Sequence, residues 1–138
     1  MNKNNEQMDD LLKQMKEDLK INEFDLIGEC RNAPNVTQKY LELFYNENRK
    51  LKKIKVKLDE VEGNRYQYYR KDFEIKLTSS ADIMRFVNKD AEYLKVKRIW
   101  VEQSSFTEFL TSVVQNFRDR LFQLRNQVEL KKIENMGV

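Results

Sequence analysis

Residues 35–62 read NVTQKYLELFYNENRKLKKIKVKLDEVE and contain neither glycine nor proline. Asn35 provides an N-cap with Gln38 three residues later, so a helix is predicted from residue 36 to about residue 70. Apolar residues recur along it at steps of seven, three, four and three, a heptad-like seam that requires a partner helix. The seam consists of Phe44, Leu51, Ile54, Leu58 and Val61, with Glu47 as its one polar position.

A second long helix is predicted from residue 91 to the C-terminus, because residues 91–133 again lack glycine and proline. Its apolar residues form a face too broad for one neighbouring helix to cover. We expect this face to pack against the first long helix and against other subunits. The residues assigned to subunit contact are Phe106, Leu110, Val113, Phe117, Leu121 and Leu124.

Shorter elements are predicted around these two helices. Residues 8–20 and 24–31 read as short helices, and the second ends before Pro34 because proline disfavours a helical conformation in the preceding residue. Gly63 would bend, fray or pause the first long helix. Residues 73–77 alternate apolar and charged side chains, which indicates an extended linker or a strand that pairs with another subunit's copy. Ser79 then begins a short helix through Val87.

The chain is therefore predicted to be mostly all-α. Its 138 residues suit a single domain with four segments, and charged residues make up 36% of the chain, which favours elongated helices that self-associate. The segments are an acidic helical part (1–34), a basic helix (35–71), an extended segment with a short helix (72–90) and a C-terminal oligomerisation helix (91–138).

Composition argues against catalysis and against cofactors. Histidine is absent and Cys30 is the only thiol, which excludes an internal disulfide, Cys/His zinc sites and histidine-based triads. Asp72, Glu74 and Lys76 resemble part of a metal-dependent nuclease site. Such a site needs its first aspartate on a separate, adjacent strand, but the upstream candidate, Asp59, lies in a predicted helix. We expect no enzymatic activity, no metal and no cofactor. No signal peptide or membrane span is expected either, and a reducing cytoplasm suits the lone thiol.

Positive charge is concentrated in residues 49–57, which carry six cations and no acid. On a helix, Arg49, Lys52 and Lys53 lie opposite the seam, while Lys50, Lys55 and Lys57 flank it. Such a face is suited to phosphate binding. The alternative is an ordinary solvated surface whose lysines pair with nearby glutamates.

Aromatic residues are interleaved with cations in the next stretch, residues 64–71. This combination suits single-stranded nucleic acid, because bases stack on aromatic rings while cations bind phosphates. Alternatively, Tyr68 and Tyr69 extend the seam, and Arg65 packs or pairs on the seam side of an unbroken helix. The candidate DNA-binding residues are Arg49, Lys50, Lys52, Lys53, Lys57, Arg65, Tyr68, Tyr69, Arg70 and Lys71.

The order and spacing of several segments resemble the UvsY recombination mediators of T-even-type bacteriophages, over most of the chain. The segments are KYL (39–41), RYQYY (65–69), DAEYLKV (90–96), RLFQLRN (120–126) and NMG (135–137).

This resemblance implies a homo-oligomeric ring, of six or seven subunits, that binds single-stranded DNA without sequence preference. It also implies loading of a UvsX-like phage recombinase onto strands coated by the phage single-strand-binding protein. The resemblance further implies a role in DNA recombination, repair and replication in the cytoplasm of an infected bacterium.

The family's DNA-binding region, a basic pair followed by Tyr-Tyr, maps onto Gly63 and Arg65 ahead of the two tyrosines. Gly63 replaces the family's lysine, and Lys71 replaces a small residue. We therefore expect phosphate contacts to shift toward Lys53, Lys57, Arg70 and Lys71. Two other functions stay open: a structural coiled-coil adaptor without DNA binding, and a module whose acidic N-terminal third docks a basic protein.

Overall fold

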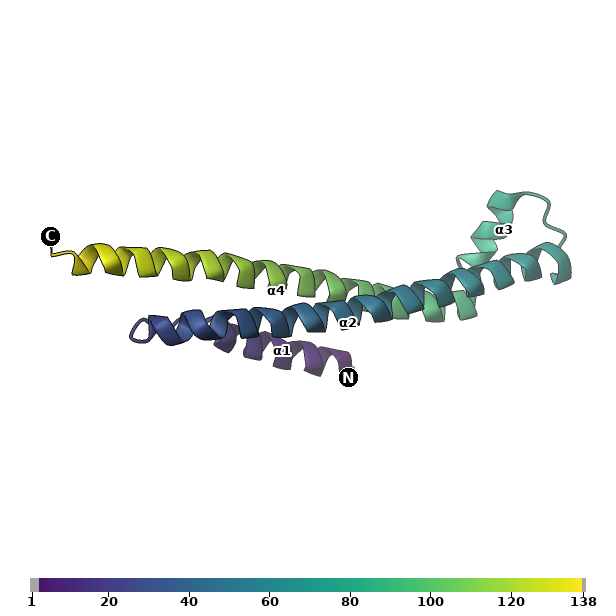
Figure 1. Cartoon of the computed structure of the whole chain (residues 1–138). Coiled ribbons are helices and arrows are strands. Elements are labelled where there is room, and N and C mark those ends of the chain that lie inside the picture. The colour runs from purple at the N-terminus through teal and green to yellow at the C-terminus, as the bar shows by residue number, and fades with distance from the viewer. Residues whose placement is uncertain (1–2, 138) are drawn as a thin grey trace. The chain divides into compact units, whose positions relative to one another are not determined.

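The computed structural model describes residues 3–137, and within that range it contains helices and no β-strand (Figure 1). The predicted all-α fold with two long helices is confirmed. The elements are α1 (Lys3–Leu19), α2 (Leu26–Gln67), the π-helical turn η1 (Tyr68–Asp72), α3 (Ser80–Val87) and α4 (Ala91–Asn135).

These elements form two compact units, and both long helices contribute to each. Unit 1 consists of residues 3–45 and 108–137, and unit 2 of residues 46–107. None of the described helices combines the length and apolar character needed to span a bilayer.

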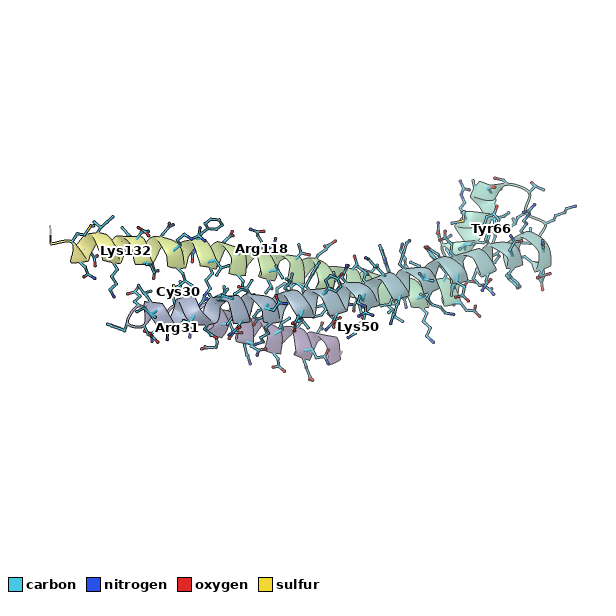
Figure 2. The ribbon with its side chains drawn as sticks, viewed as in Figure 1. Cys30, Arg31, Lys50, Tyr66, Arg118 and Lys132 are labelled. Atoms are coloured by element: carbon cyan, nitrogen blue, oxygen red, sulfur yellow. The ribbon has the colours of Figure 1, made fainter. Side chains whose placement is uncertain are left out.

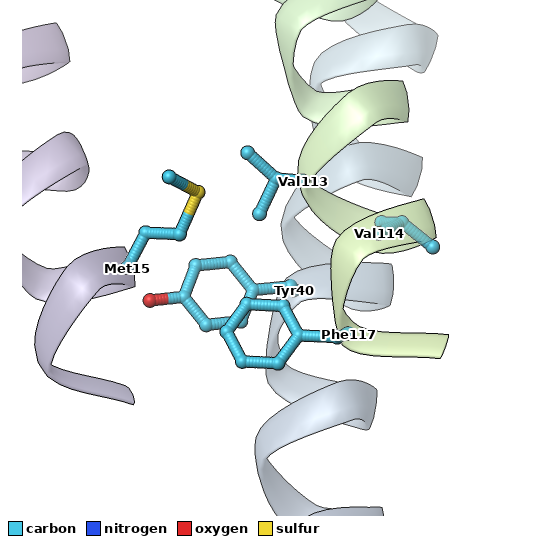
Figure 3. Packing of buried hydrophobic residues seen from close by; sticks show 5 residues of the cluster. All are labelled: Met15, Tyr40, Val113, Val114 and Phe117. Carbon is cyan, nitrogen blue, oxygen red and sulfur yellow. The ribbon is translucent and has the colours of Figure 1, made fainter. Parts of the chain in front are cut away.

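The core of unit 1 is built from three helices (Figure 3). Met15 of α1, Tyr40 of α2, and Val113 and Phe117 of α4 meet there and are buried. The Tyr40 ring stacks on Phe117 with centroids 4.4 Å apart, and its hydroxyl donates a 2.7 Å hydrogen bond to Asp18 of α1. Burial, together with this hydrogen bond to a carboxylate, raises the pKa of Tyr40 above its ordinary value.

Arg120 of α4 joins the end of α1 to the start of α2. Its buried guanidinium donates to the carbonyl oxygens of Leu19 at 3.3 Å and Lys20 at 3.2 Å, and forms an ion pair with Glu29 of α2. The last carbonyls of a helix lack intrahelical partners, so Arg120 hydrogen-bonds carbonyl groups that α1 itself leaves unpaired. One side chain thereby fixes two helix ends.

The predicted boundary at Pro34 is wrong, because α2 begins at Leu26 and contains Pro34 in its interior. A proline inside a helix removes one hydrogen bond and costs roughly 3 kcal/mol. The N-terminal end of α2 is nevertheless held: Asp25 accepts the Gly28 N–H at 3.1 Å, and Glu29 pairs with Arg120. Tertiary contacts therefore outweigh the local preference.

The core of unit 2 contains Leu58 of α2, Ile83 and Val87 of α3, and Tyr93 of α4. Glu47, the polar position of the predicted seam, is satisfied because the Gln103 side-chain amide donates to its carbonyl oxygen at 2.9 Å and its carboxylate at 2.8 Å. The seam thus packs against α4 with its one charged member hydrogen-bonded.

The predicted fraying or pause at Gly63 is wrong, because α2 continues through it to Gln67. The apolar residues of the segment 73–77 do not share one buried side, since Phe73 and Leu77 are partly buried while Ile75 is exposed. The chain bends at residues 73–75, which breaks the alternation. Helix α3 begins after Ser79 as predicted, but the Ser79 side chain makes no capping hydrogen bond.

The apolar face of α4 lies largely inside the single chain. Of the six residues assigned to subunit contact, Leu110, Val113, Phe117 and Leu124 are buried, and Phe106 and Leu121 are partly buried. Their role in oligomerisation stays a prediction. The buried four have almost no exposed surface, so they can contact another subunit only if the helices that cover them move.

Candidate nucleic-acid interface

The basic stretch of α2 has one packed side and one exposed side, as predicted. All six cations of residues 49–57 are exposed, whereas Leu51 and Ile54 are partly buried and Leu58 is fully buried. Lys50, within this stretch, is labelled in Figure 2. The helix therefore presents its cations away from its packed seam.

Three of these cations have no acidic partner. Within residues 3–137, no ion pair or hydrogen bond engages the side chains of Arg49, Lys52 or Lys53. The flanking cations do pair along the helix: Lys50 with Glu47 at 2.9 Å, Lys55 with Asp59 at 3.2 Å and Lys57 with Glu60 at 3.9 Å. The centre of the exposed face is thus the part most available to phosphate.

The two units differ in charge. Unit 2 holds 15 of the 26 basic residues and 10 of the 23 acidic ones, a net charge of +5. The remaining 11 basic and 13 acidic residues give unit 1 a net charge of −2. All ten candidate DNA-binding residues lie in unit 2. The small net charge of the whole chain conceals how basic this unit is.

A π-helical turn ends the predicted DNA-binding region. The Phe73 N–H donates to the Tyr68 carbonyl oxygen at 3.0 Å, closing η1 directly after α2. Arg70 and Lys71 are exposed on this turn, and Tyr68 retains 36% of its surface. Single π-helical turns occur frequently at functional sites.

Arg65 is engaged inside unit 2. Its Nε donates to Asp90 at 2.8 Å, one of its terminal nitrogens lies 3.7 Å from Glu92, and its guanidinium lies 4.3 Å from the Tyr68 ring centre. Two carboxylates therefore neutralise its charge. This geometry agrees with the alternative prediction, in which Arg65 packs or forms ion pairs within the protein.

Tyr69 is held by the same carboxylate. Its hydroxyl donates to Asp90 at 2.8 Å, and its ring packs against the unit 2 core. Burial opposes ionisation of Asp90, but hydrogen bonds from the Tyr93 N–H, Tyr69 and Arg65 outweigh it and lower the pKa of Asp90. Burial and the bond to Asp90 raise the pKa of Tyr69. Arg65 and Tyr69 are thus primarily structural in this geometry.

Two clusters of candidate residues result. Arg49, Lys50, Lys52, Lys53 and Lys57 share α2, and the other five lie at its C-terminal end and on η1. Lys95, Lys97 and Arg98 of α4, also in unit 2, were not predicted from the sequence. They are three cations within four residues, close to Trp100. The combination of cations with aromatic residues, which marked residues 64–71, would also have identified this stretch.

Carboxylates and the thiol do not gather into a metal site. Among residues 3–137, no group of three or more potential Asp, Glu, Cys or His ligands is close enough to hold an ion. The candidate site therefore consists of cations and aromatic rings.

These features define a class: an all-helical protein with a strongly basic unit whose cations and tyrosines suit a nucleic-acid strand. The family model for the "Recombination, repair and ssDNA binding protein UvsY" matches residues 14–137. The chain belongs to the UvsY family, which confirms the resemblance seen in the sequence. No curated protein sequence matches it.

Solved structures share the fold. One crystal structure of the bacteriophage T4 recombination mediator protein UvsY, lattice type IV, matches with a TM-score of 0.81 at 18% identity, covering 91% of this chain and 97% of that one. The lattice type II structure matches with a TM-score of 0.82 at 17% identity, covering 92% and 96%. At this identity, the likeness describes the fold and not the side chains of the site.

Proposed function

We propose that the chain is a recombination mediator that binds single-stranded DNA without sequence preference through the exposed basic face of α2. The observation that carries this proposal is the unpaired state of Arg49, Lys52 and Lys53 among the described residues, on the side opposite the packed seam. A face of cations without a hydrogen-bonding pattern for base edges binds phosphate and not sequence.

The finer steps of the proposal rest on membership of the family. The chain would help to load a phage recombinase onto strands coated by single-strand-binding protein, in the cytoplasm of an infected bacterium. A ring of six or seven subunits would present several basic faces to one strand. Neighbouring sites then raise avidity by effective concentration, so each subunit can bind weakly.

Reversing the charge at the centre of the basic face tests the proposal. We expect Lys52→Glu combined with Lys53→Glu to weaken binding of a labelled single-stranded oligonucleotide, measured by fluorescence anisotropy. The log-log salt slope should become shallower by about 1.4, because each phosphate contact on a single strand contributes about 0.7.

The matched control is Lys13→Glu combined with Lys16→Glu, which makes the same charge change on exposed lysines of α1 in unit 1. Equal effects of the two double variants would show that only net charge matters and would refute the site. A wild-type affinity that does not change with salt would instead favour the structural coiled-coil adaptor.

A further inference from the structure

Trp100 is the only tryptophan of the chain and lies on α4 within unit 2. One side of it packs against the unit 2 core, and it is only partly buried. Trp100 therefore keeps some exposed surface in the more basic unit of the protein.

Two lysines from different helices lie over this ring. The Nζ of Lys55 on α2 is 5.4 Å from the ring centre, and the Nζ of Lys97 on α4 is 4.9 Å from it. Both distances are within the range of cation–π attraction. The fold of unit 2 thus brings together an aromatic surface and two ammonium groups that lie 42 residues apart in sequence.

The charge around Trp100 is available to a polyanion. Lys97 has no ion pair among residues 3–137, and residues 93–101 contain three cations and no acid. Lys55 pairs with Asp59 at 3.2 Å, but about half of each side chain is exposed, 52% and 57%. Exposed pairs of this kind are weak and screened by salt, so a phosphate can displace Asp59.

We propose that Trp100, Lys55 and Lys97 form a base-stacking subsite for single-stranded DNA. One nucleobase stacks on the exposed part of the indole, and the two ammonium groups turn from the ring to the phosphates on either side. Stacking accepts any base, because every base has a π-face. The proposal rests on the proposed function and adds a binding element on α4.

Lys55 connects this subsite to the basic face of α2, since it belongs to the same run of cations as Lys52 and Lys53. All of these residues lie in unit 2. A strand that binds the basic face by phosphate contacts alone would gain its base contact at Trp100.

Because Trp100 is the sole tryptophan, its fluorescence reports on this subsite alone. The full-length chain is titrated with an end-labelled oligothymidylate while anisotropy and tryptophan emission are recorded together. We expect emission to be quenched in parallel with the rise in anisotropy. An oligonucleotide of abasic sites keeps the phosphates without the bases, so it should bind more weakly and leave emission unquenched.

The outcomes separate the two proposals. Binding by anisotropy with unchanged tryptophan emission overturns the stacking subsite and leaves the proposed function standing. Absence of binding by anisotropy overturns both. Equal quenching by the abasic strand also overturns the subsite, because it would show that bases are not what reaches the indole.

Variants give a second test. Trp100→Ala should weaken oligothymidylate binding roughly 5- to 100-fold, the range that one base stack supplies, while Trp100→Phe should keep most of the affinity. Thermal melting checks folding, because Trp100 also packs against the unit 2 core.

Lysine variants avoid that packing. Lys97→Gln should weaken binding more than Lys95→Gln, which removes the same charge from an exposed position about 140° around α4 from Trp100. Equal losses from the two variants would overturn the assignment of Lys97 to the subsite, whatever the stability of Trp100→Ala.

Discussion

Asp90 is the residue on which the polar contacts of unit 2 converge. Its buried carboxylate accepts hydrogen bonds from Arg65 at 2.8 Å, the Tyr69 hydroxyl at 2.8 Å and the Tyr93 N–H at 3.0 Å, and the last of these caps the start of α4. Arg65 and Tyr69 were both predicted to bind DNA. Because both side chains are bound to Asp90, they hold the C-terminal end of α2 and the following turn η1 against α4.

The lowered pKa of Asp90 makes this contact sensitive to acid. A carboxyl whose folded pKa is below its unfolded value of about 4 stabilises the fold above pH 4, and the contribution is lost as pH falls through the folded pKa. We expect Asp90→Asn to lower the free energy of unfolding by about 2 kcal/mol at pH 7, with the difference from wild type narrowing toward pH 2. Urea denaturation at both pH values measures this difference.

Glu92→Gln is the control for Asp90→Asn. Glu92 is 73% exposed and reaches Arg65 only at 3.7 Å, so the change should have little effect on stability at either pH. A pH-independent loss in Asp90→Asn would contradict the charged contact and point to the helix cap alone.

At the scale of elements, the sequence predicted what depends on local pattern. The seam of α2, the exposed side of residues 49–57 and the long α4 follow from helical periodicity, and the structure agrees. Poor intrinsic helix preference predicts a boundary at Pro34 and a bend, fray or pause at Gly63. That preference is a local quantity, and contacts such as Glu29 with Arg120, 91 residues away in sequence, outweigh it.

The parts of the candidate site that the sequence does not predict depend on contacts between different helices. Asp90 pairs with Arg65 across 25 residues, and Trp100 meets Lys55 only through the packing of α2 on α4. Periodicity along one helix identifies the faces of that helix but not the opposing residue on another. The basic face was therefore predictable, and the neutralisation of Arg65 was not.

Gly63 provides the test at this scale. A Cβ at this position would meet no atom within 4 Å, and the position lies inside α2. Gly63→Ala should therefore raise the free energy of unfolding by about 1 kcal/mol, the difference in helix propensity between the two residues, with DNA affinity unchanged. Thermal or urea denaturation measures the first quantity and oligonucleotide anisotropy the second.

Gly63→Lys introduces the lysine that the resemblance to the family implies at this position, and Gly63→Ala is its matched control. Both variants should raise the free energy of unfolding by a similar amount. The lysine should also bind a phosphate and steepen the log-log salt slope by about 0.7. Identical salt slopes for the two variants would show that the strand does not pass this part of α2.

At the scale of the whole chain, a group of strongly exposed apolar side chains lies near the C-terminal end of α4, and none of them belongs to the face assigned to subunit contact. The sequence showed that α4 is apolar on a broad face, but it could not show which part the chain itself would cover. Within residues 122–135, three apolar side chains are more than half exposed and fall within an arc of about 80° at 100° per residue. They are Phe122, Leu130 and Ile133.

This difference predicts two kinds of variant. Leu130→Asp places a charge on a 60% exposed position, so it should lower the native mass of the assembly while helicity and melting behaviour are kept. Val113→Asp places a charge in the core beside Tyr40 and Phe117, so it should unfold unit 1. Native mass spectrometry and circular dichroism on both variants distinguish these effects. If Val113→Asp instead yielded folded single chains, the buried face would be the subunit contact, and α1 and α2 would have to leave it during assembly.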